Sequence, residues 1–141
     1  MKFSVIIPLY NKAPYVRKAL ESVFAQTYTD YELIVIDDGS TDDSAEIAEE
    51  VLQEATPHRP IASSPYRLLK QANAGVSAAR NNGVASSNGD YVSFLDADDW
   101  WDPTYLERMA QLIEDYPDAG LYASNYYYHK DGINIIKVDI P

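Results

Sequence analysis

Short apolar runs that alternate with helical patterns place the strongest constraint on the fold of this chain. Phe3–Leu9 and residues 31–36 are nearly continuous stretches of apolar and β-branched residues, which is typical of strands buried on both faces of a parallel sheet. Residues 91–95 repeat the pattern, and Tyr66–Lys70 is a candidate for a further strand. The sequence therefore predicts four strands of a mostly parallel sheet.

Helical periodicity fills the segments between these runs. Apolar or small residues recur at helical spacing within 16–24, 47–52 and 76–85, and Pro14 suits a first helical turn. A last helix is expected to follow an N-cap at Asp102. Strands that alternate with helices in this way predict an α/β fold with an open, mostly parallel sheet and flanking helices.

The remaining segments are interpreted within a single domain that spans residues 1–141. The proline-rich stretch 56–65 is read as a loop because proline disrupts regular structure. Residues 121–127 are expected to form a fifth strand. Residues 133–141 are expected to form a strand that has lost its neighbours.

Charge and composition exclude several classes of protein. The 22 acidic and 11 basic residues give a formal net charge of -11, which repels a polyanion, so nucleic acid is not an expected partner. Cysteine is absent, which excludes disulfides and thiolate metal sites. No apolar run approaches the ~20 residues of a transmembrane segment and no leader pattern occurs, so the expected location is the cytoplasm.

An acidic cluster follows the predicted strand 91–95. Asp96, Asp98 and Asp99 lie where an open α/β sheet binds ligands, beyond the carboxyl end of a strand. Carboxylates this close repel one another unless a cation neutralises them, and Mg²⁺ or Mn²⁺ takes such oxygen ligands together with substrate phosphates. The cluster therefore predicts a divalent metal site. The alternative is that Asp98, Asp99 and Asp102 are turn and cap residues before the next helix.

Two further segments contain candidate ligand-binding residues. Asp38 follows the second strand, where a carboxylate can accept hydrogen bonds from a ribose or a base, and Gly39 permits close approach of the backbone. Arg80 is the only basic residue of its predicted helix, and its guanidinium can pair with a diphosphate or with Asp98. Helix capping and an ordinary surface arginine are the alternatives. No glycine-rich phosphate-binding motif occurs, so we expect metal to hold the phosphate.

Four segments, in this order, resemble the family 2 glycosyltransferases, which are inverting enzymes of GT-A fold that use nucleotide-diphosphate sugars. The segments are V-I-I-P-L-Y-N-K, Q-T-Y-T-D-Y-E-L-I-V-I-D-D-G-S-T-D, N-A-G-V-S-A-A-R-N-N-G and Y-V-S-F-L-D-A-D-D-W. Each is weak alone, whereas the four together are specific. The resemblance implies a GT-A (Rossmann-like) sheet and a glycosyltransferase of hexosyltransferase type that acts in polysaccharide biosynthesis.

The resemblance also implies roles for residues around the donor base. Pro8 and Tyr10 would border the base, which is usually uracil, so that UDP-sugar is the expected donor. Asp38 would contact the base. Arg80 would lie near the donor.

On the metal side, the resemblance implies a D-x-D motif. Asp96 would bind the ribose side of the donor and Asp98 would bind the metal, with Asp99 in or beside the metal site. The implied cofactor is Mn²⁺ or Mg²⁺.

One part of the family pattern is missing. Family members continue past this length and contain a later acidic residue that serves as catalytic base, and no such residue is recognisable after Asp118. We therefore expect the base beyond Pro141 and a GT-A domain that is incomplete, so that this chain supplies donor and metal binding but does not itself transfer sugar. The expected acceptor is a saccharide or a lipid-linked molecule, and the full-length protein is expected in the cytoplasm or peripherally at the inner face of the membrane.

Two other functions remain as alternatives. One is a non-catalytic module that binds nucleotide sugars. The other is a sugar nucleotidyltransferase, which normally has a glycine-rich, basic loop after the first strand where this chain has Y-N-K-A-P.

Overall fold

The computed structural model describes residues 1–56, 65–124, 127–130 and 133–136. The elements, in chain order, are β1 (Phe3–Leu9), α1 (Val16–Phe24), β2 (Tyr31–Asp37), α2 (Ser44–Ala55), β3 (Tyr66–Lys70), α3 (Val76–Ala85), β4 (Tyr91–Phe94), α4 (Tyr105–Asp115), β5 (Tyr127–Lys130) and β6 (Ile133–Ile136). The chain divides into two compact units, Met1–Glu107 and Arg108–Pro141, and each is described by itself.

A parallel sheet with the strand order β3-β2-β1-β4 forms the centre of the first unit. In register, Phe3 of β1 lies between Tyr31 of β2 and Tyr91 of β4. Every residue of β1 and β2 is buried, because both strands are central in the sheet and covered on both faces. The predicted parallel α/β sheet is confirmed.

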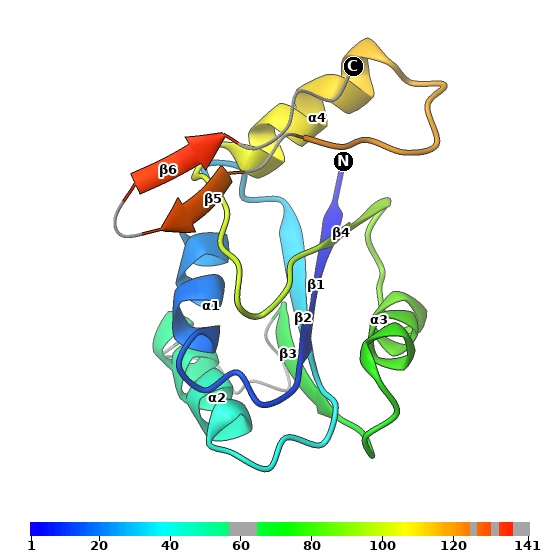
Figure 1. Cartoon of the computed structure of the whole chain (residues 1–141). Helices are drawn as coiled ribbons and strands as arrows, with labels where there is room; N and C mark the ends of the chain where they lie inside the picture. Colours follow the sequence, from blue (N-terminus) through cyan, green and yellow to red (C-terminus); the bar gives the residue numbers. More distant parts are fainter. Residues whose placement is uncertain (57–64, 125–126, 131–132, 137–141) are drawn as a thin grey trace. The chain divides into compact units, whose positions relative to one another are not determined.

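Helices cover both faces of this sheet, as Figure 1 shows, with α1 and α2 on one face and α3 on the other. The α1 helix buries its apolar stripe, which includes Val16 and Leu20. On the other face α3 lies so close to β1 that a Cβ built at Gly83 would be 2.4 Å from Ile6 Cγ2. The lack of a side chain at Gly83 therefore lets α3 lie close against β1.

The edge strand β4 differs from its prediction as a buried strand. It ends at Phe94, and the side chains of Val92 and Phe94 are 38% and 44% exposed. Within the described residues, β4 has β1 as its one hydrogen-bonded neighbour, and α3 packs mainly on β1 and β2. An apolar strand sequence thus identified the strand but not its place at the edge.

Two helices begin later than the sequence suggested. The α1 helix begins at Val16, so Pro14 lies in the turn before it. The α4 helix begins at Tyr105, and the Asp102 carboxylate accepts hydrogen bonds from the backbone N–H and the hydroxyl of Thr104 in the preceding turn. Asp102 therefore acts at the start of this helix as predicted, although the first regular turn follows it.

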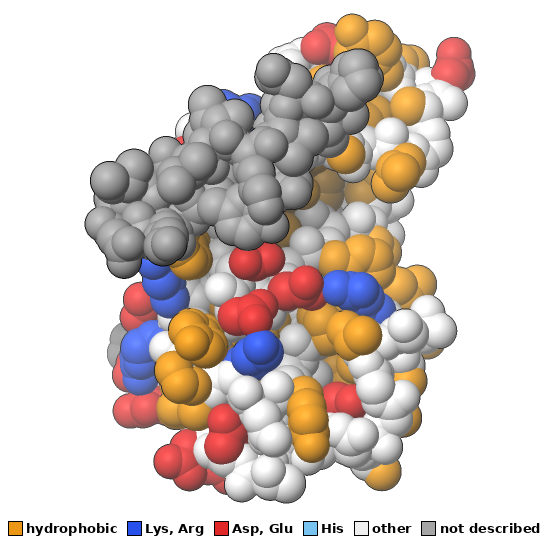
Figure 2. Space-filling model, in the orientation of Figure 1, with side chains coloured by type: hydrophobic (Ala, Val, Ile, Leu, Met, Phe, Trp, Pro, Cys, Tyr) orange, Lys and Arg blue, Asp and Glu red, His pale blue; other side chains and the backbone are white. Residues whose placement is uncertain are grey.

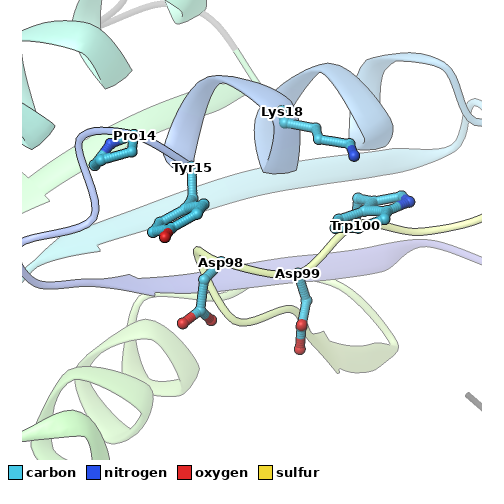
Figure 3. Close-up of a pocket in the computed structure, with 6 residues that line it drawn as sticks. All are labelled: Pro14, Tyr15, Lys18, Asp98, Asp99 and Trp100. Atoms are coloured by element: carbon cyan, nitrogen blue, oxygen red, sulfur yellow. The ribbon is translucent and has the colours of Figure 1, made fainter. Parts of the chain in front are cut away.

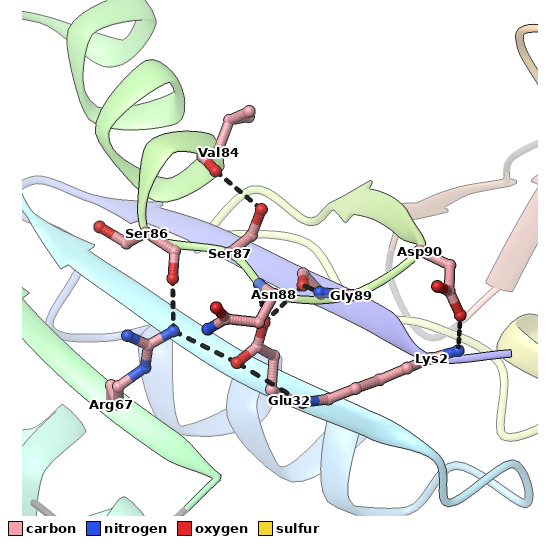
Figure 4. A network of polar contacts seen from close by, with 10 residues as sticks. Lys2, Glu32, Arg67, Val84, Ser86, Ser87, Asn88, Gly89 and Asp90 are labelled. Atoms are coloured by element: carbon pink, nitrogen blue, oxygen red, sulfur yellow. Dashed lines mark hydrogen bonds and ion pairs between the residues drawn. The ribbon is translucent and has the colours of Figure 1, made fainter.

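A buried polar network connects the strands at the amino-terminal end of the sheet (Figure 4). Glu32 is 4% exposed, and its carboxylate accepts hydrogen bonds from the Ser4 hydroxyl at 2.6 Å and from the Asn88 N–H at 2.5 Å. Arg67 donates to the same carboxylate at 3.2 Å and to the Ser86 carbonyl at 2.6 Å. The turn between α3 and β4 is thereby fixed to β1, β2 and β3.

The second unit contains most of α4 and an antiparallel pair, β5 and β6, in which Tyr127 lies opposite Ile136. Residues 121–124 are not in a strand, so the predicted strand 121–127 is wrong over those residues; Leu121 is 85% exposed and enters no sheet. Residues 57–64 of the predicted loop and 137–141 of the predicted last strand lie outside the described residues. Within the described chain, every helix is too short or too polar to cross a membrane.

Candidate functional site

A groove of about 480 Å³ lies at the carboxyl ends of β1, β2 and β4. Among the residues that line it are all the sequence-predicted site residues except Asp99, namely Pro8, Tyr10, Asp38, Arg80, Asp96 and Asp98. On the face of the molecule seen in Figure 2, acidic side chains gather beside Lys and Arg side chains. The parallel strands therefore bring residues from four distant segments of the chain to one edge of the sheet.

Asp38, at the end of β2, is held firmly by the chain itself. It is 2% exposed, and its carboxylate accepts hydrogen bonds from Gln71 Nε2 at 2.7 Å and from the N–H groups of Ala74 and Gly75 at 2.9 and 2.8 Å. Burial opposes the charge, but these hydrogen bonds outweigh burial and lower the pKa of Asp38. The anionic side chain also lies at the amino-terminal end of α3, where the helix dipole favours it.

Two glycines in left-handed conformations flank Asp38, and one of them, Gly39, allows the loops to approach each other. Gly39 and Gly75 have φ angles of 73° and 93°, in the region that favours glycine. A Cβ at Gly39 would lie 3.0 Å from the backbone nitrogen of Asn73. Gly39 therefore allows a close approach of the chain's own loop before α3, whereas its predicted approach to a ligand stays a prediction.

Arg80 extends from α3 to the loop after β4. Its Nη2 donates to Asp96 Oδ1 at 2.6 Å, and its guanidinium carbon lies 5.8 Å from the centre of the Phe94 ring. Among the described residues, none accepts a hydrogen bond from the buried Arg80 Nε. The sequence suggested a diphosphate or Asp98 as the partner of Arg80, whereas the structure pairs it with Asp96.

The partner of Asp98 is Lys12, which the sequence analysis did not single out. Lys12 Nζ lies 2.6 Å from Asp98 Oδ2, and both side chains are about two-fifths exposed, at 39% and 40%. The hydrogen bond to Asp98 outweighs burial and raises the pKa of Lys12. The sequence signal that could have identified Lys12 is its positive charge in the loop after the first strand, two residues beyond Tyr10.

The loop that carries Lys12 is clamped to the start of α2. Asn11 adopts a left-handed conformation with φ of 50°, and its Oδ1 accepts a hydrogen bond from the Thr41 N–H at 2.8 Å. The Asn11 N–H donates to Ser40 Oγ at 3.1 Å, and the Lys12 N–H donates to Ser44 Oγ at 2.7 Å. The loops after β1 and β2 therefore form one connected wall of the groove.

Asp99 does not line the groove. It lines a small hollow of about 40 Å³ together with Asp98, Lys18 and Trp100 (Figure 3), and Asp98 lines both the hollow and the groove. Lys18 Nζ lies 3.3 Å from the centre of the Trp100 ring. Burial, and then the neighbouring carboxylates, raise the pKa of Asp99.

The acids at the groove suit a hard divalent ion that binds together with a phosphate. Among the described residues, no group of three or more His, Asp or Glu side chains is arranged to hold a metal. Asp96 and Asp98 nevertheless offer oxygen ligands at the groove. Mg²⁺ typically uses one or two carboxylates and completes its coordination with water and substrate phosphates. These two carboxylates therefore fit an ion that is also coordinated by the phosphate of a ligand.

Comparison with known proteins identifies the family. The model of the family described as "Glycosyl transferase family 2" matches residues 4–140. This chain belongs to glycosyltransferase family 2. Among curated proteins, it is 42% identical over 128 residues to "Glycosyltransferase GlyA" of Streptococcus pneumoniae, and the aligned region covers 89% of this chain and 17% of GlyA. It is 45% identical over 132 residues to "Uncharacterized glycosyltransferase YibD" of Escherichia coli, and here the aligned region covers 93% of this chain and 36% of YibD. The chain thus spans well under half the length of these relatives.

Solved structures of glycosyltransferases have the same fold. The S. aureus TarS fragment 1-349 in complex with UDP-GlcNAc superimposes with a TM-score of 0.72 at 29% identity, covering 83% of this chain and 32% of that one. The mannosyltransferase PcManGT from Pyrobaculum calidifontis, in complex with GDP-Man and Mn²⁺, gives a TM-score of 0.69 at 25% identity, covering 79% and 32%. The expected GT-A fold is confirmed, and this chain covers part of it.

Proposed function

We propose that the groove at the ends of β1, β2 and β4 binds the nucleotide-diphosphate part of a sugar donor, with UDP-sugar as the donor and Mn²⁺ or Mg²⁺ as the ion. The observation that carries this proposal is the convergence of Pro8, Tyr10, Asp38, Arg80, Asp96 and Asp98 in one groove. Support comes from family membership and from the TarS structure that contains UDP-GlcNAc. The divalent ion is supported by the related mannosyltransferase structure that contains Mn²⁺.

The base is assigned to the side of the groove formed by Pro8, Tyr10 and Asp38. Tyr10 is 45% exposed, so its ring is available to a flat ligand. Asp38 Oδ1 accepts two hydrogen bonds and Oδ2 accepts one. A carboxylate oxygen can accept two, so Oδ2 retains the capacity to accept one from a base N–H.

The diphosphate is assigned to the side where Arg80, Asp96 and Asp98 meet. Asp96 faces the ribose side and Asp98 is the principal metal ligand in this proposal. Asp99 as a further ligand stays a prediction, because it does not line the groove, although it shares the neighbouring hollow with Asp98. A divalent ion bound by Asp98 would neutralise charge on the leaving diphosphate.

For the full-length protein we propose transfer of a hexose with inversion to a saccharide or lipid-linked acceptor in polysaccharide biosynthesis. A base would take the proton of the acceptor hydroxyl as that oxygen attacks the anomeric carbon. We assign this base to sequence beyond Pro141. The present chain would supply donor and metal binding without transfer.

The test is a calorimetric titration of the chain with UDP, once with Mn²⁺ and once with excess EDTA. Clear binding with Mn²⁺ and much weaker binding with EDTA are expected, because the metal links the carboxylates to the diphosphate. GDP serves as the comparison nucleotide and should bind more weakly. Equal affinity for UDP in both conditions would remove the metal from the proposal, and no binding in either would remove the donor site.

A further inference from the structure

We infer that the Lys12 ammonium is the counter-ion of the Asp98 carboxylate and that it couples the binding of the metal to the binding of the diphosphate. The metal then binds well only when a diphosphate is present. This inference rests on the proposed function, because it concerns the order and coupling of binding in the same groove. The contact that motivates it is the 2.6 Å ion pair between Lys12 Nζ and Asp98 Oδ2.

The position of Lys12 is set by its backbone. Its N–H donates to Ser44 Oγ at 2.7 Å, and its carbonyl accepts hydrogen bonds from the N–H groups of Tyr15 and Val16 at 2.9 and 3.0 Å. Asn11, the residue before Lys12, has a left-handed conformation and is held by a hydrogen bond from the Thr41 N–H to its Oδ1. A lysine on a loop held at both sides pays less conformational entropy to reach Asp98 than one on a free loop.

Each of the two acids at the proposed metal side of the groove has a cationic partner within the chain. Lys12 pairs with Asp98, and Arg80 pairs with Asp96. The charge of Asp38 is taken up by the N–H groups before α3 and by Gln71. The acids that would bind the metal are therefore already neutralised, each by a cation from another segment of the chain.

This pairing makes the two ligands depend on each other. A divalent ion that enters alone places two positive charges beside Lys12, and a diphosphate that enters alone places negative charge beside Asp98. When both enter, Asp98 can turn to the metal while the Lys12 ammonium turns to a phosphate oxygen, which lysine binds as a compact charge. Every charge then keeps a partner, so the metal and the diphosphate bind more favourably together than either does alone.

Lys12 carries this coupling more directly than Arg80 does. Lys12 contacts the acid proposed as the principal metal ligand, whereas Arg80 contacts the acid proposed for the ribose side. The lysine side chain is also flexible and partly exposed, so it can change partners without movement of the backbone.

The experiment measures Mn²⁺ binding to this chain by the electron paramagnetic resonance signal of free Mn²⁺, without nucleotide and with saturating UDP. In the wild type, UDP should strengthen Mn²⁺ binding markedly. In Lys12→Gln, Mn²⁺ without nucleotide should bind about fivefold more tightly, as expected for the loss of a competing, partly exposed ion pair. The strengthening by UDP should shrink by about the same factor, because it is measured against the Mn²⁺ affinity without nucleotide. The effect of Mn²⁺ on the affinity for UDP should shrink equally, because coupling between two ligands is reciprocal.

Two control variants separate this coupling from general effects of charge and folding. Lys2→Gln removes the same charge at the opposite end of the sheet, where Lys2 Nζ lies 3.9 Å from Glu32, and should bind Mn²⁺ as the wild type does. Lys12→Arg keeps the cation and should retain weak Mn²⁺ binding without nucleotide. Circular dichroism establishes that each variant is folded.

Distinct results overturn the inference and the proposed function. If the wild type shows coupled binding of Mn²⁺ and UDP but Lys12→Gln matches it under both conditions, the role of Lys12 is wrong and the donor site stands. If Lys12→Arg behaves like Lys12→Gln, the cation is not responsible and the inference also fails. If the wild type binds no Mn²⁺–UDP at all, both fall.

Discussion

The Arg80 guanidinium donates to the Asp96 carboxylate at 2.6 Å, so a helix that covers one face of the sheet holds the loop at the end of its edge strand. This contact orients Asp96, the acid proposed for the ribose side of the donor. It also keeps a cation beside the proposed diphosphate site.

Arg80→Lys should weaken the binding of UDP with Mn²⁺ about tenfold, because lysine keeps the charge but loses the planar fork that can bond Asp96 and a phosphate together. Isothermal titration calorimetry measures this. Arg17→Lys is the matched control, since Arg17 pairs with Glu50 and Glu54 on the exposed side of α1. An unchanged affinity in Arg80→Lys would show that the guanidinium does not contact the donor.

Asp98→Asn should abolish the dependence of UDP binding on Mn²⁺ while the fold is retained, because the side chain is 40% exposed and pairs with one lysine. Calorimetric titrations with Mn²⁺ and with EDTA give the comparison. Asp30→Asn, at the exposed turn before β2, removes the same charge far from the groove and should keep the dependence. Asp99→Asn in the same assay decides whether the residue in the neighbouring hollow is a ligand.

Asp38→Asn should destabilise the fold by about 1–3 kcal/mol, because an amide cannot accept all three hydrogen bonds from Gln71, Ala74 and Gly75 without leaving a buried donor unpaired. Urea denaturation at neutral pH measures the free energy of unfolding. Asp43→Asn serves as control, since the exposed Asp43 makes no side-chain capping bond at the start of α2. Equal stability of the two variants would contradict a structural role for Asp38.

Glu32 should make the free energy of unfolding fall as the solution is acidified. Burial opposes its charge, but hydrogen bonds from Ser4 and Asn88 outweigh burial and lower the pKa of Glu32 in the folded chain. The stabilisation is therefore complete above the unfolded pKa, which is about 4.3, and is lost as the pH falls through the lower folded value. Urea denaturation between about pH 5 and pH 3 should show a smaller loss of stability in Glu32→Gln than in the wild type. The same loss in both proteins would place the acid sensitivity elsewhere.

Gly83→Ala should destabilise the fold by about 1–3 kcal/mol, because the added Cβ would lie 2.4 Å from Ile6 Cγ2 and push α3 away from β1. Thermal and urea denaturation report the change. Gly120→Ala is the control, since a Cβ there would meet no atom within 4 Å. If both substitutions have the same small effect, α3 does not depend on this close contact.

Most of the first unit could be predicted from the sequence because its signals are local. The continuous apolar runs of β1 and β2 required burial on both faces, and the acidic segments after β2 and β4 marked the edge at which a ligand is expected. The same rule failed for β4, where Val92 and Phe94 are partly exposed. An apolar run indicates a strand, but its place in the strand order depends on long-range pairing.

The pairing of charges could not be predicted for the same reason. Lys12 and Asp98 are 86 residues apart in sequence, and they meet because β4 lies next to β1 in the sheet. Arg80 was expected to pair with a diphosphate or with Asp98, and among the acids of the described chain it reaches Asp96 and not Asp98. Sequence spacing placed these residues at one edge, whereas register and strand order decided which cation faces which acid.

The internal pairing of acids and cations at the groove also bears on how fast a donor arrives. Paired charges contribute little to the field at a distance, so an approaching nucleotide responds mainly to the overall net charge of -11. A free diphosphate is repelled by that field, whereas a metal–nucleotide complex carries less negative charge and meets a lower barrier to encounter. We therefore expect association to speed up as salt screens the repulsion, and the pre-formed complex to be the species that docks.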